Sequence, residues 1–224
     1  MPFSPDKAAF ALIAVGIAVL GVPMAADSIV RLYAGVQQDR PPVNDPRALV
    51  GIAADARQME LLDDRFDDAR ARIEAGLLQL RVAIGTAPGP LDPESLTRAV
   101  DNLDRGLARA PADARAWTAL AYALTSFGDR AKAAKSLGMA LYLSQYDPTL
   151  TVPWCELGLE LWPDLSPDDQ RKVARQIQVA WSGHRKEVIA MARASNFTPL
   201  ISASLAENPA ERADFDQAVV SATQ

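Results

Sequence analysis

The fold of this chain is decided by residues 98–145, RAVDNLDRGLARAPADARAWTALAYALTSFGDRAKAAKSLGMALYLSQ. Apolar residues recur in it at three- and four-residue steps on both sides of Gly128-Asp129, a spacing typical of amphipathic helices. We expect Gly128 to end the first helix in the left-handed conformation and Asp129 to cap the second. Small residues are expected where the helices come closest: Ala121, Ala133 and Ala140. The stretch therefore predicts a tight antiparallel helical hairpin.

Aligned on Trp117, residues 114–147 resemble a tetratricopeptide repeat, a helical hairpin of about 34 residues with Trp, Leu, Gly, Tyr, Ala, Phe, Ala and Pro at fixed offsets. Four positions depart from that pattern: Ala121 replaces Gly, Leu124 replaces Tyr, Leu137 replaces Phe, and the closing proline slips to Pro148. The resemblance implies an all-α fold of antiparallel hairpins stacked as a short solenoid, with Trp117 and Ala133 in its core.

The same spacing of small and large apolar residues recurs in other parts of the chain. It is seen in Ala69, Ile73, Gly76 and Leu77, and again in Ala99, Leu103, Gly106 and Leu107. Residues 85–93, rich in Gly and Pro, cannot be helical, so we expect the helix at 65–84 to pair with the helix at 94–110 across this loop. After Pro148, a degenerate third hairpin is predicted, because four residues match the positions of the first helix of the repeat: Trp154, Leu157, Gly158 and Leu161.

These patterns divide the chain into four predicted segments. Residues 1–36 hold an N-terminal tail and a transmembrane anchor, and residues 37–46 form a Pro-rich spacer. Residues 47–197 form the tetratricopeptide-like domain. Residues 198–224 hold short helices, the last of which is expected to cap the stack through Phe215.

The anchor is predicted because residues 8–26 carry no charged side chain. A helix of that length spans about 28 Å, close to the hydrocarbon thickness of a bilayer. A retained single-span anchor is favoured over a cleaved signal peptide, because Met24 stands where cleavage after Ala26 requires a small residue. A row of small residues is a candidate for packing against another membrane helix, although alanine is abundant in this segment: Ala14, Ala18, Gly21 and Ala25.

The orientation of the anchor rests on two opposing signals. The N-terminal tail is short, which is typical of signal-anchors that export the rest of the chain. Arg31, Arg40 and Arg47 after the span argue for the opposite orientation. We expect a single-pass protein of the inner (plasma) membrane whose C-terminal domain is periplasmic.

Composition argues against several classes of function. The formal net charge is -5, whereas nonspecific binding of nucleic acid needs clustered Lys and Arg. The acidic run at residues 63–68 is interpreted as a solvated, salt-bridged helix face. Cys155 is interpreted as a small buried residue, and His184, the one histidine, as a surface residue. No nucleophile–base pair, metal-ligand set or phosphate loop is recognisable, so neither an enzyme nor a cofactor is expected.

The resemblance implies a protein-binding face on the first helix of the well-matched repeat, the alternative being an ordinary solvated face. Its candidate residues are Arg115, Thr118, Tyr122, Thr125 and Ser126. The chain is similar to single-span bacterial proteins whose tetratricopeptide domains act as accessories to envelope assembly or secretion machineries. The expected function is therefore a membrane-anchored scaffold for other proteins, binding a peptide segment or subunits of a membrane complex. The alternative is a structural subunit packed into a larger membrane complex through its transmembrane helix.

Overall fold

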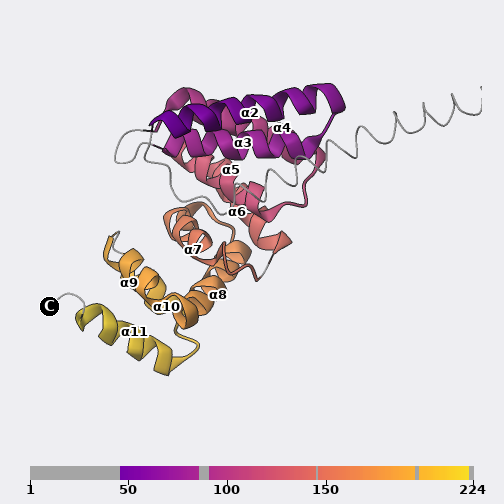
Figure 1. Ribbon diagram of the computed structural model, residues 1–224. Coiled ribbons are helices and arrows are strands. Elements are labelled where there is room, and N and C mark those ends of the chain that lie inside the picture. Colours follow the sequence, from indigo (N-terminus) through magenta and orange to yellow (C-terminus); the bar gives the residue numbers. More distant parts are fainter. Residues whose placement is uncertain (1–45, 86–90, 145, 195–196, 222–224) are drawn as a thin grey trace, which may run out of the picture. The chain divides into compact units, whose positions relative to one another are not determined.

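The computed structural model describes residues 46–85, 91–144, 146–194 and 197–221. Within these ranges the chain forms ten α-helices, α2 to α11, one short 3-10 helix and no strand (Figure 1). The predicted all-α fold class is thus confirmed for the described residues. The chain divides into two compact units, Met1–Pro111 (unit 1) and Ala112–Gln224 (unit 2). Their boundary falls inside the range 47–197 that the sequence groups as one repeat domain.

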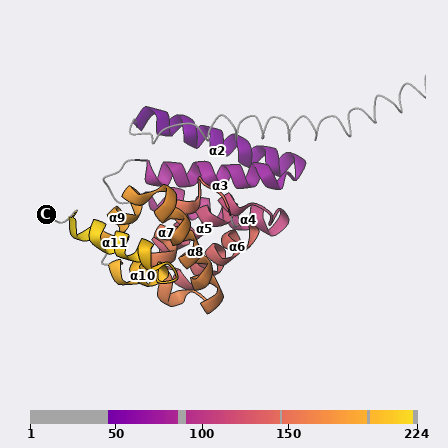
Figure 2. The ribbon, with the colours of Figure 1, turned by 90° about the horizontal axis from the view of Figure 1, so that it is seen from below.

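Unit 1 contains three helices in its described part: α2 (Pro46–Phe66), α3 (Ala69–Ile84) and α4 (Pro93–Arg109). α3 packs against both of the others, and α2 and α3 lie side by side in every view (Figure 2). The predicted pairing of the helix at 65–84 with the helix at 94–110 is therefore confirmed as the packing of α3 against α4.

Local signals set the starts of these helices. Asp67 adopts a left-handed conformation, with φ of 53°, which turns the chain between α2 and α3. Asp68 then caps α3, and its carboxylate accepts a 2.9 Å hydrogen bond from the backbone N–H of Arg70. Asp92 caps α4 by accepting a 2.9 Å bond from the backbone N–H of Ser95.

Glycines allow α3 and α4 to approach closely. A Cβ atom on Gly76 would lie 2.7 Å from Leu103 Cγ and 2.9 Å from its backbone nitrogen. A Cβ atom on Gly106 would lie 2.7 Å from Ile73 Cγ1. Each helix thus presents a glycine to a large aliphatic residue of the other. The core between α2 and α3 is apolar, and its buried members are Leu49, Ile52, Ala56, Met59, Ala71, Ala75 and Leu78.

Unit 2 is built on two hairpins and three further helices after them. Its elements are α5 (Ala114–Phe127), α6 (Arg130–Leu143), α7 (Thr151–Glu160), a 3-10 turn (Trp162–Asp164), α8 (Pro167–Gly183), α9 (Arg185–Ala194), α10 (Thr198–Ser204) and α11 (Pro209–Ser221). α5 pairs with α6 and α7 pairs with α8, while α7 also contacts both helices of the first hairpin. The two hairpins predicted from the sequence are therefore present in unit 2.

The α5–α6 hairpin has the predicted turn and interior. Gly128 ends α5 with a left-handed φ of 89°, and the Asp129 carboxylate caps α6 by accepting from the backbone N–H of Lys132 at 3.2 Å. Ala121, Ala133 and Ala140 are all fully buried.

Trp117 differs from its prediction as a core residue, because its side chain is only half-buried. The core of α5 is supplied instead by its smaller aliphatic side chains, among them Leu120 and Leu124. The fully buried tryptophans of this unit are Trp154 and Trp181.

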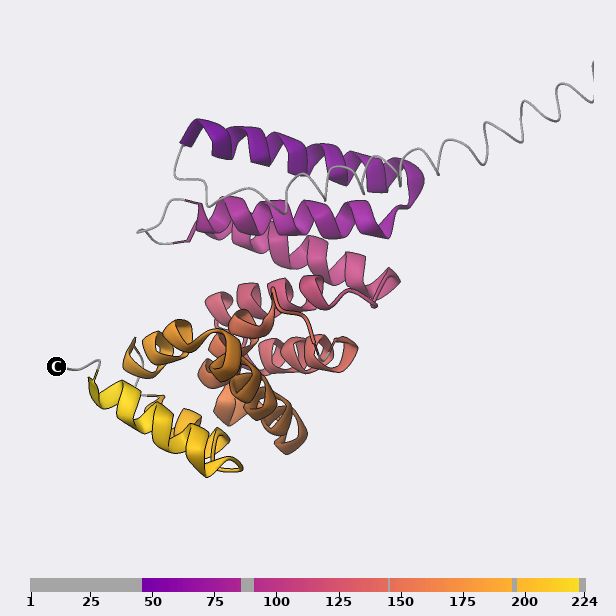
Figure 3. The same cartoon turned by 60° about the horizontal axis from the view of Figure 1, so that its bottom comes forward.

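The last helix, α11, lies beside α9 and α10 (Figure 3). Its Phe215 is fully buried, and the Phe215 and Trp181 rings meet edge-to-face with centroids 5.4 Å apart. The Arg185 guanidinium lies over the Trp181 ring at 4.2 Å and also pairs with Asp214. Burial of Phe215 is what the expected capping role of this helix requires.

No helix within the described ranges has the length and apolar character needed to span a bilayer. The predicted anchor at residues 8–26 and spacer residues 37–45 lie outside the described residues. So does the proposed packing row of the anchor: Ala14, Ala18, Gly21 and Ala25.

Candidate protein-interaction site

The binding face predicted on α5 is narrower in the structure than in the prediction. Thr118 is only 6% exposed, and its Oγ1 accepts a 2.8 Å hydrogen bond from the Trp154 indole N–H. The same hydroxyl donates to the backbone carbonyl of Ala114 at 2.7 Å. Thr118 therefore packs in the interior between α5 and α7, and the prediction that it lines an open face is wrong.

The other four predicted positions are at least partly accessible. Tyr122 is 39% exposed and Ser126 is exposed, whereas Arg115 and Thr125 are half-buried. The Thr125 hydroxyl donates to the Ala121 carbonyl at 2.8 Å, which occupies its proton within the helix. Tyr122 and Ser126 thus remain as the accessible part of the predicted face.

A larger apolar surface, which the sequence patterns do not single out, lies on the second helix of the hairpin. The exposed fraction is 70% for Tyr142 and 82% for Tyr146, and two aliphatic neighbours are also exposed. We name this surface the α6 patch, formed by Met139, Tyr142, Leu143 and Tyr146. Met139, Tyr142 and Leu143 lie at three- and four-residue steps on one side of α6, and Tyr146 follows beyond the end of the helix. Exposed Tyr and Met in a group are characteristic of interfaces with other proteins.

A groove begins beside the α6 patch, between the end of α6 and α8. α8 approaches α6 closely at Gly138, where a Cβ atom would lie 2.9 Å from Asp169 Oδ2. Beyond this contact is a cavity of about 340 Å³, which we name the α6–α8 groove. It is lined by Leu141, Tyr146, Asp168, Arg171, Lys172, Arg175, Gln176, Gln178, Val179 and Glu207. Tyr146 therefore belongs to both the α6 patch and the groove.

The α8 wall of the groove carries three cations, two of which are paired. Asp168 forms ion pairs with Arg171 at 2.9 Å and Lys172 at 3.2 Å, and Lys172 also pairs with Asp169 at 2.9 Å. The hydrogen bond with Lys172, followed by that with Arg171, lowers the pKa of Asp168. Arg175 is exposed and forms no ion pair with another described residue. It is thus the groove cation most available to a ligand.

A second cavity of unit 2, about 590 Å³, is acidic. Its lining consists of Glu156, Glu160, Glu187, Ala190, Met191, Ala194 and Phe197. Burial raises the pKa of Glu156. This cavity is therefore lined by three carboxylates together with apolar side chains.

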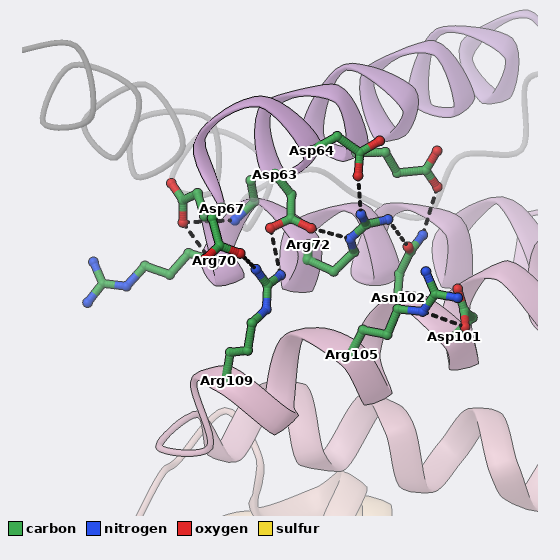
Figure 4. A network of polar contacts seen from close by, with 12 residues as sticks. Asp63, Asp64, Asp67, Arg70, Arg72, Asp101, Asn102, Arg105 and Arg109 are labelled. Atoms are coloured by element: carbon green, nitrogen blue, oxygen red, sulfur yellow. Dashed lines mark hydrogen bonds and ion pairs between the residues drawn. The ribbon is translucent and has the colours of Figure 1, made fainter. Parts of the chain in front are cut away.

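Unit 1 carries a network of ion pairs that joins its three helices (Figure 4). Asp63 of α2 is 5% exposed and accepts from Arg72 Nε of α3 and from an Arg109 guanidinium nitrogen of α4, each at 2.6 Å. Arg72 also donates to Asn102 Oδ1 at 3.1 Å, and Asn102 donates to Glu60 Oε1 at 2.8 Å. These groups satisfy one another, which indicates a structural role.

The network corrects one interpretation of the sequence. The acidic run at 63–68 is expected to be solvated, but Asp63 is buried between two arginines. Other members of the run fit the expectation, since Asp64 and Asp67 are exposed while each pairs with an arginine, Arg72 and Arg109 respectively.

The two residues considered for chemistry, Cys155 and His184, lie apart from the groove. Cys155 is fully buried, and burial, followed by the charge of Glu156, raises its pKa to about 12. Its thiol is therefore protonated at neutral pH. His184 lies at the end of α8, where its backbone N–H donates to the Ala180 carbonyl at 2.6 Å. Among the described residues, no group of three or more His, Cys, Asp or Glu side chains is arranged to hold a metal ion.

Comparison with known proteins gives no relative for this chain: no protein-family model, curated protein or solved structure matches it. The candidate site therefore rests on the geometry of unit 2.

Proposed function

We propose that this chain is a membrane-anchored, tetratricopeptide-like scaffold that binds other proteins in the bacterial cell envelope, as an accessory to an envelope assembly or secretion machinery. The observation that carries the proposal is the α6 patch, in which Tyr142 and Tyr146 are largely exposed beside Met139 and Leu143. Large aromatic side chains left in solvent are common binding anchors, because they bury much area at little cost in conformational entropy.

The arrangement of hairpins in unit 2 supports the repeat-like part of the proposal. α7 contacts both helices of the α5–α6 hairpin, and each repeat of a solenoid contacts its neighbour in this way. The hairpin at residues 114–147 supports the repeat-like part of the proposal as well. The small residues of its repeat pattern, Ala121, Ala133 and Ala140, are buried.

The proposed anchor is supported by the uncharged sequence of residues 8–26. A reporter enzyme that is active only after export, fused at Gln224, tests the orientation. Activity of this fusion is expected, and activity of a cytoplasm-dependent reporter at the same position would contradict it. Loss of the first ~26 residues from the mature protein would contradict a retained anchor.

Scaffolding through the α6 patch is tested by site-specific photo-crosslinking in native membranes. A photoreactive phenylalanine at Tyr142 should give a discrete adduct with an envelope protein. The same group at Val50, which is 71% exposed on α2, serves as the control for nonspecific capture. Equal capture at the two positions, or none at Tyr142, would contradict the proposal.

The alternative proposal, a structural subunit packed through its transmembrane helix, is favoured by the small residues Ala14, Ala18, Gly21 and Ala25 of the sequence. It predicts detergent-resistant co-purification with other membrane subunits in a fixed ratio. Salt-sensitive capture in variable amounts favours the scaffold instead.

A further inference from the structure

We propose that the α6–α8 groove binds an acidic segment of a partner protein, with an apolar side chain held against Tyr146 and Val179 and a carboxylate held by Arg175. The proposal rests on the scaffold function and names the chemistry of the partner. It concerns a surface that lies on α8 and the end of α6, away from the face of α5 that the tetratricopeptide resemblance implies.

The apolar side of the groove is open to a ligand. Tyr146 is 82% exposed and Val179 is 41% exposed, although both line the same cavity. Leu141, which is buried, closes the base of the cavity. An apolar side chain placed between Tyr146 and Val179 would remove its own surface and part of theirs from water, which favours binding in proportion to the area covered.

The charged side of the groove selects a carboxylate. The lining contains three cations, Arg171, Lys172 and Arg175, against two carboxylates, Asp168 and Glu207. Asp168 is already held by Arg171 and Lys172, so these two cations are partly neutralised. Arg175, which is exposed and has no ion-pair partner among the described residues, offers a planar guanidinium that matches a carboxylate in geometry.

The size of the groove limits what it takes. A cavity of about 340 Å³ accommodates one or two side chains and not a folded domain. The rest of a bound segment would continue over the exposed α6 patch, which shares Tyr146 with the groove. The ligand that fits is therefore a short peptide segment in which an acidic residue neighbours an apolar one.

The experiment uses the full-length chain, purified in detergent and immobilised, and a displayed library of random dodecapeptides. Selected peptides are expected to be enriched in Asp or Glu next to Phe, Leu or Trp. Their affinities for the parent and for variants are then measured by fluorescence anisotropy with synthetic peptides. Arg175→Glu and Tyr146→Ala should each weaken binding roughly tenfold or more, and Arg175→Glu should favour peptides in which Lys replaces the acidic residue.

Matched controls separate the groove from other surfaces. Arg193→Glu makes the same charge change at an exposed residue of α9, and Phe127→Ala removes an exposed aromatic side chain from the end of α5; both should bind the acidic peptides like the parent. Circular dichroism of each variant checks that the fold is kept, as expected for exposed positions. Selection of no peptide, of peptides without acidic residues, or of peptides that bind Arg175→Glu as well as the parent overturns the groove assignment. Peptides whose binding is lost with Phe127→Ala but kept with Arg175→Glu and Tyr146→Ala would also overturn the groove assignment. This outcome would leave the scaffold function standing.

Discussion

The Trp154 indole N–H donates a 2.8 Å hydrogen bond to Thr118 Oγ1, and both residues are buried. The bond ties α7 to α5, the first helices of two successive hairpins. Because a fully buried donor has no access to water, the indole depends on this single hydroxyl for its hydrogen bond.

Thr118→Val should therefore destabilise unit 2. Valine keeps the shape of threonine but leaves the Trp154 N–H without an acceptor, at a cost of about 1–3 kcal/mol in the free energy of unfolding. Urea denaturation followed by circular dichroism measures it. Thr125→Val is the matched control, since that hydroxyl bonds only to a carbonyl of its own helix, and it should cost less than about 1 kcal/mol. Equal losses for the two variants would contradict the role of the Trp154–Thr118 bond.

Gly76→Ala should destabilise unit 1. Its Cβ atom would meet the backbone nitrogen of Leu103 at 2.9 Å, so α3 and α4 must move apart, at about 1–3 kcal/mol. Gly51→Ala makes the same change inside α2 with no atom within 4 Å, and should stabilise the protein by about 0.5–1 kcal/mol. Thermal melts of the two variants should shift in opposite directions, and shifts of the same sign would contradict the close packing of α3 on α4.

Asp63→Asn should weaken the packing of all three helices of unit 1. It removes the negative charge between Arg72 and Arg109. Because Arg72 keeps Asp64 and Arg109 keeps Asp67 as partners, neither arginine is left unpaired, and the expected cost is about 1.5–3 kcal/mol. Asp104→Asn is the control, because Asp104 is exposed on α4 and should change stability by less than about 0.5 kcal/mol. Denaturant midpoints of the two variants provide the measurement, and a midpoint for Asp63→Asn equal to that of the control would show the network to be dispensable.

Cys155 should be inert in the native protein. Its thiol is buried with a pKa raised from 9.0 to about 12, so a thiol reagent at pH 8 should label it only after denaturation. A raised pKa of an acid means that the folded state holds the proton more tightly than the unfolded state. The stability contributed by the thiol is therefore complete below pH 9 and is lost as the pH rises toward 12. Rapid labelling of the native protein at pH 8 would contradict the burial of this residue.

The turn between α5 and α6 could be predicted from the sequence because its signals, Gly128 and Asp129, are local, and the other caps are of the same local kind. Asp68, Asp92, Asp129 and Ser166 each cap the next helix in the chain, and Gly128 needs only its own lack of a side chain to adopt a positive φ. Such interactions involve residues two or three positions apart, so their pattern is visible in one stretch of chain.

The burial of individual polar residues could not be predicted in the same way. Thr118 is buried by Trp154, which lies 36 residues later in the chain, and Asp63 is buried by Arg109, which lies 46 residues later. Nothing in the neighbouring sequence distinguishes these two from solvated residues. The α6 patch is a different case, because its spacing is visible in the sequence, but apolar residues on two sides of a helix do not reveal which side is covered.

The reciprocal contacts of Gly76 with Leu103 and of Gly106 with Ile73 have a consequence for local opening. A Cβ atom on either glycine would touch backbone of the other helix, so the two main chains are nearly in contact and neither helix is able to loosen by a change of rotamer alone. α3 and α4 should then open as one cooperative unit. Slow amide hydrogen exchange should report a single opening free energy for the protected amides of both helices. α2 reaches α4 only through side-chain ion pairs and hydrogen bonds, such as Asp63 with Arg109 and Glu60 with Asn102, so it should be free to open at lower energy.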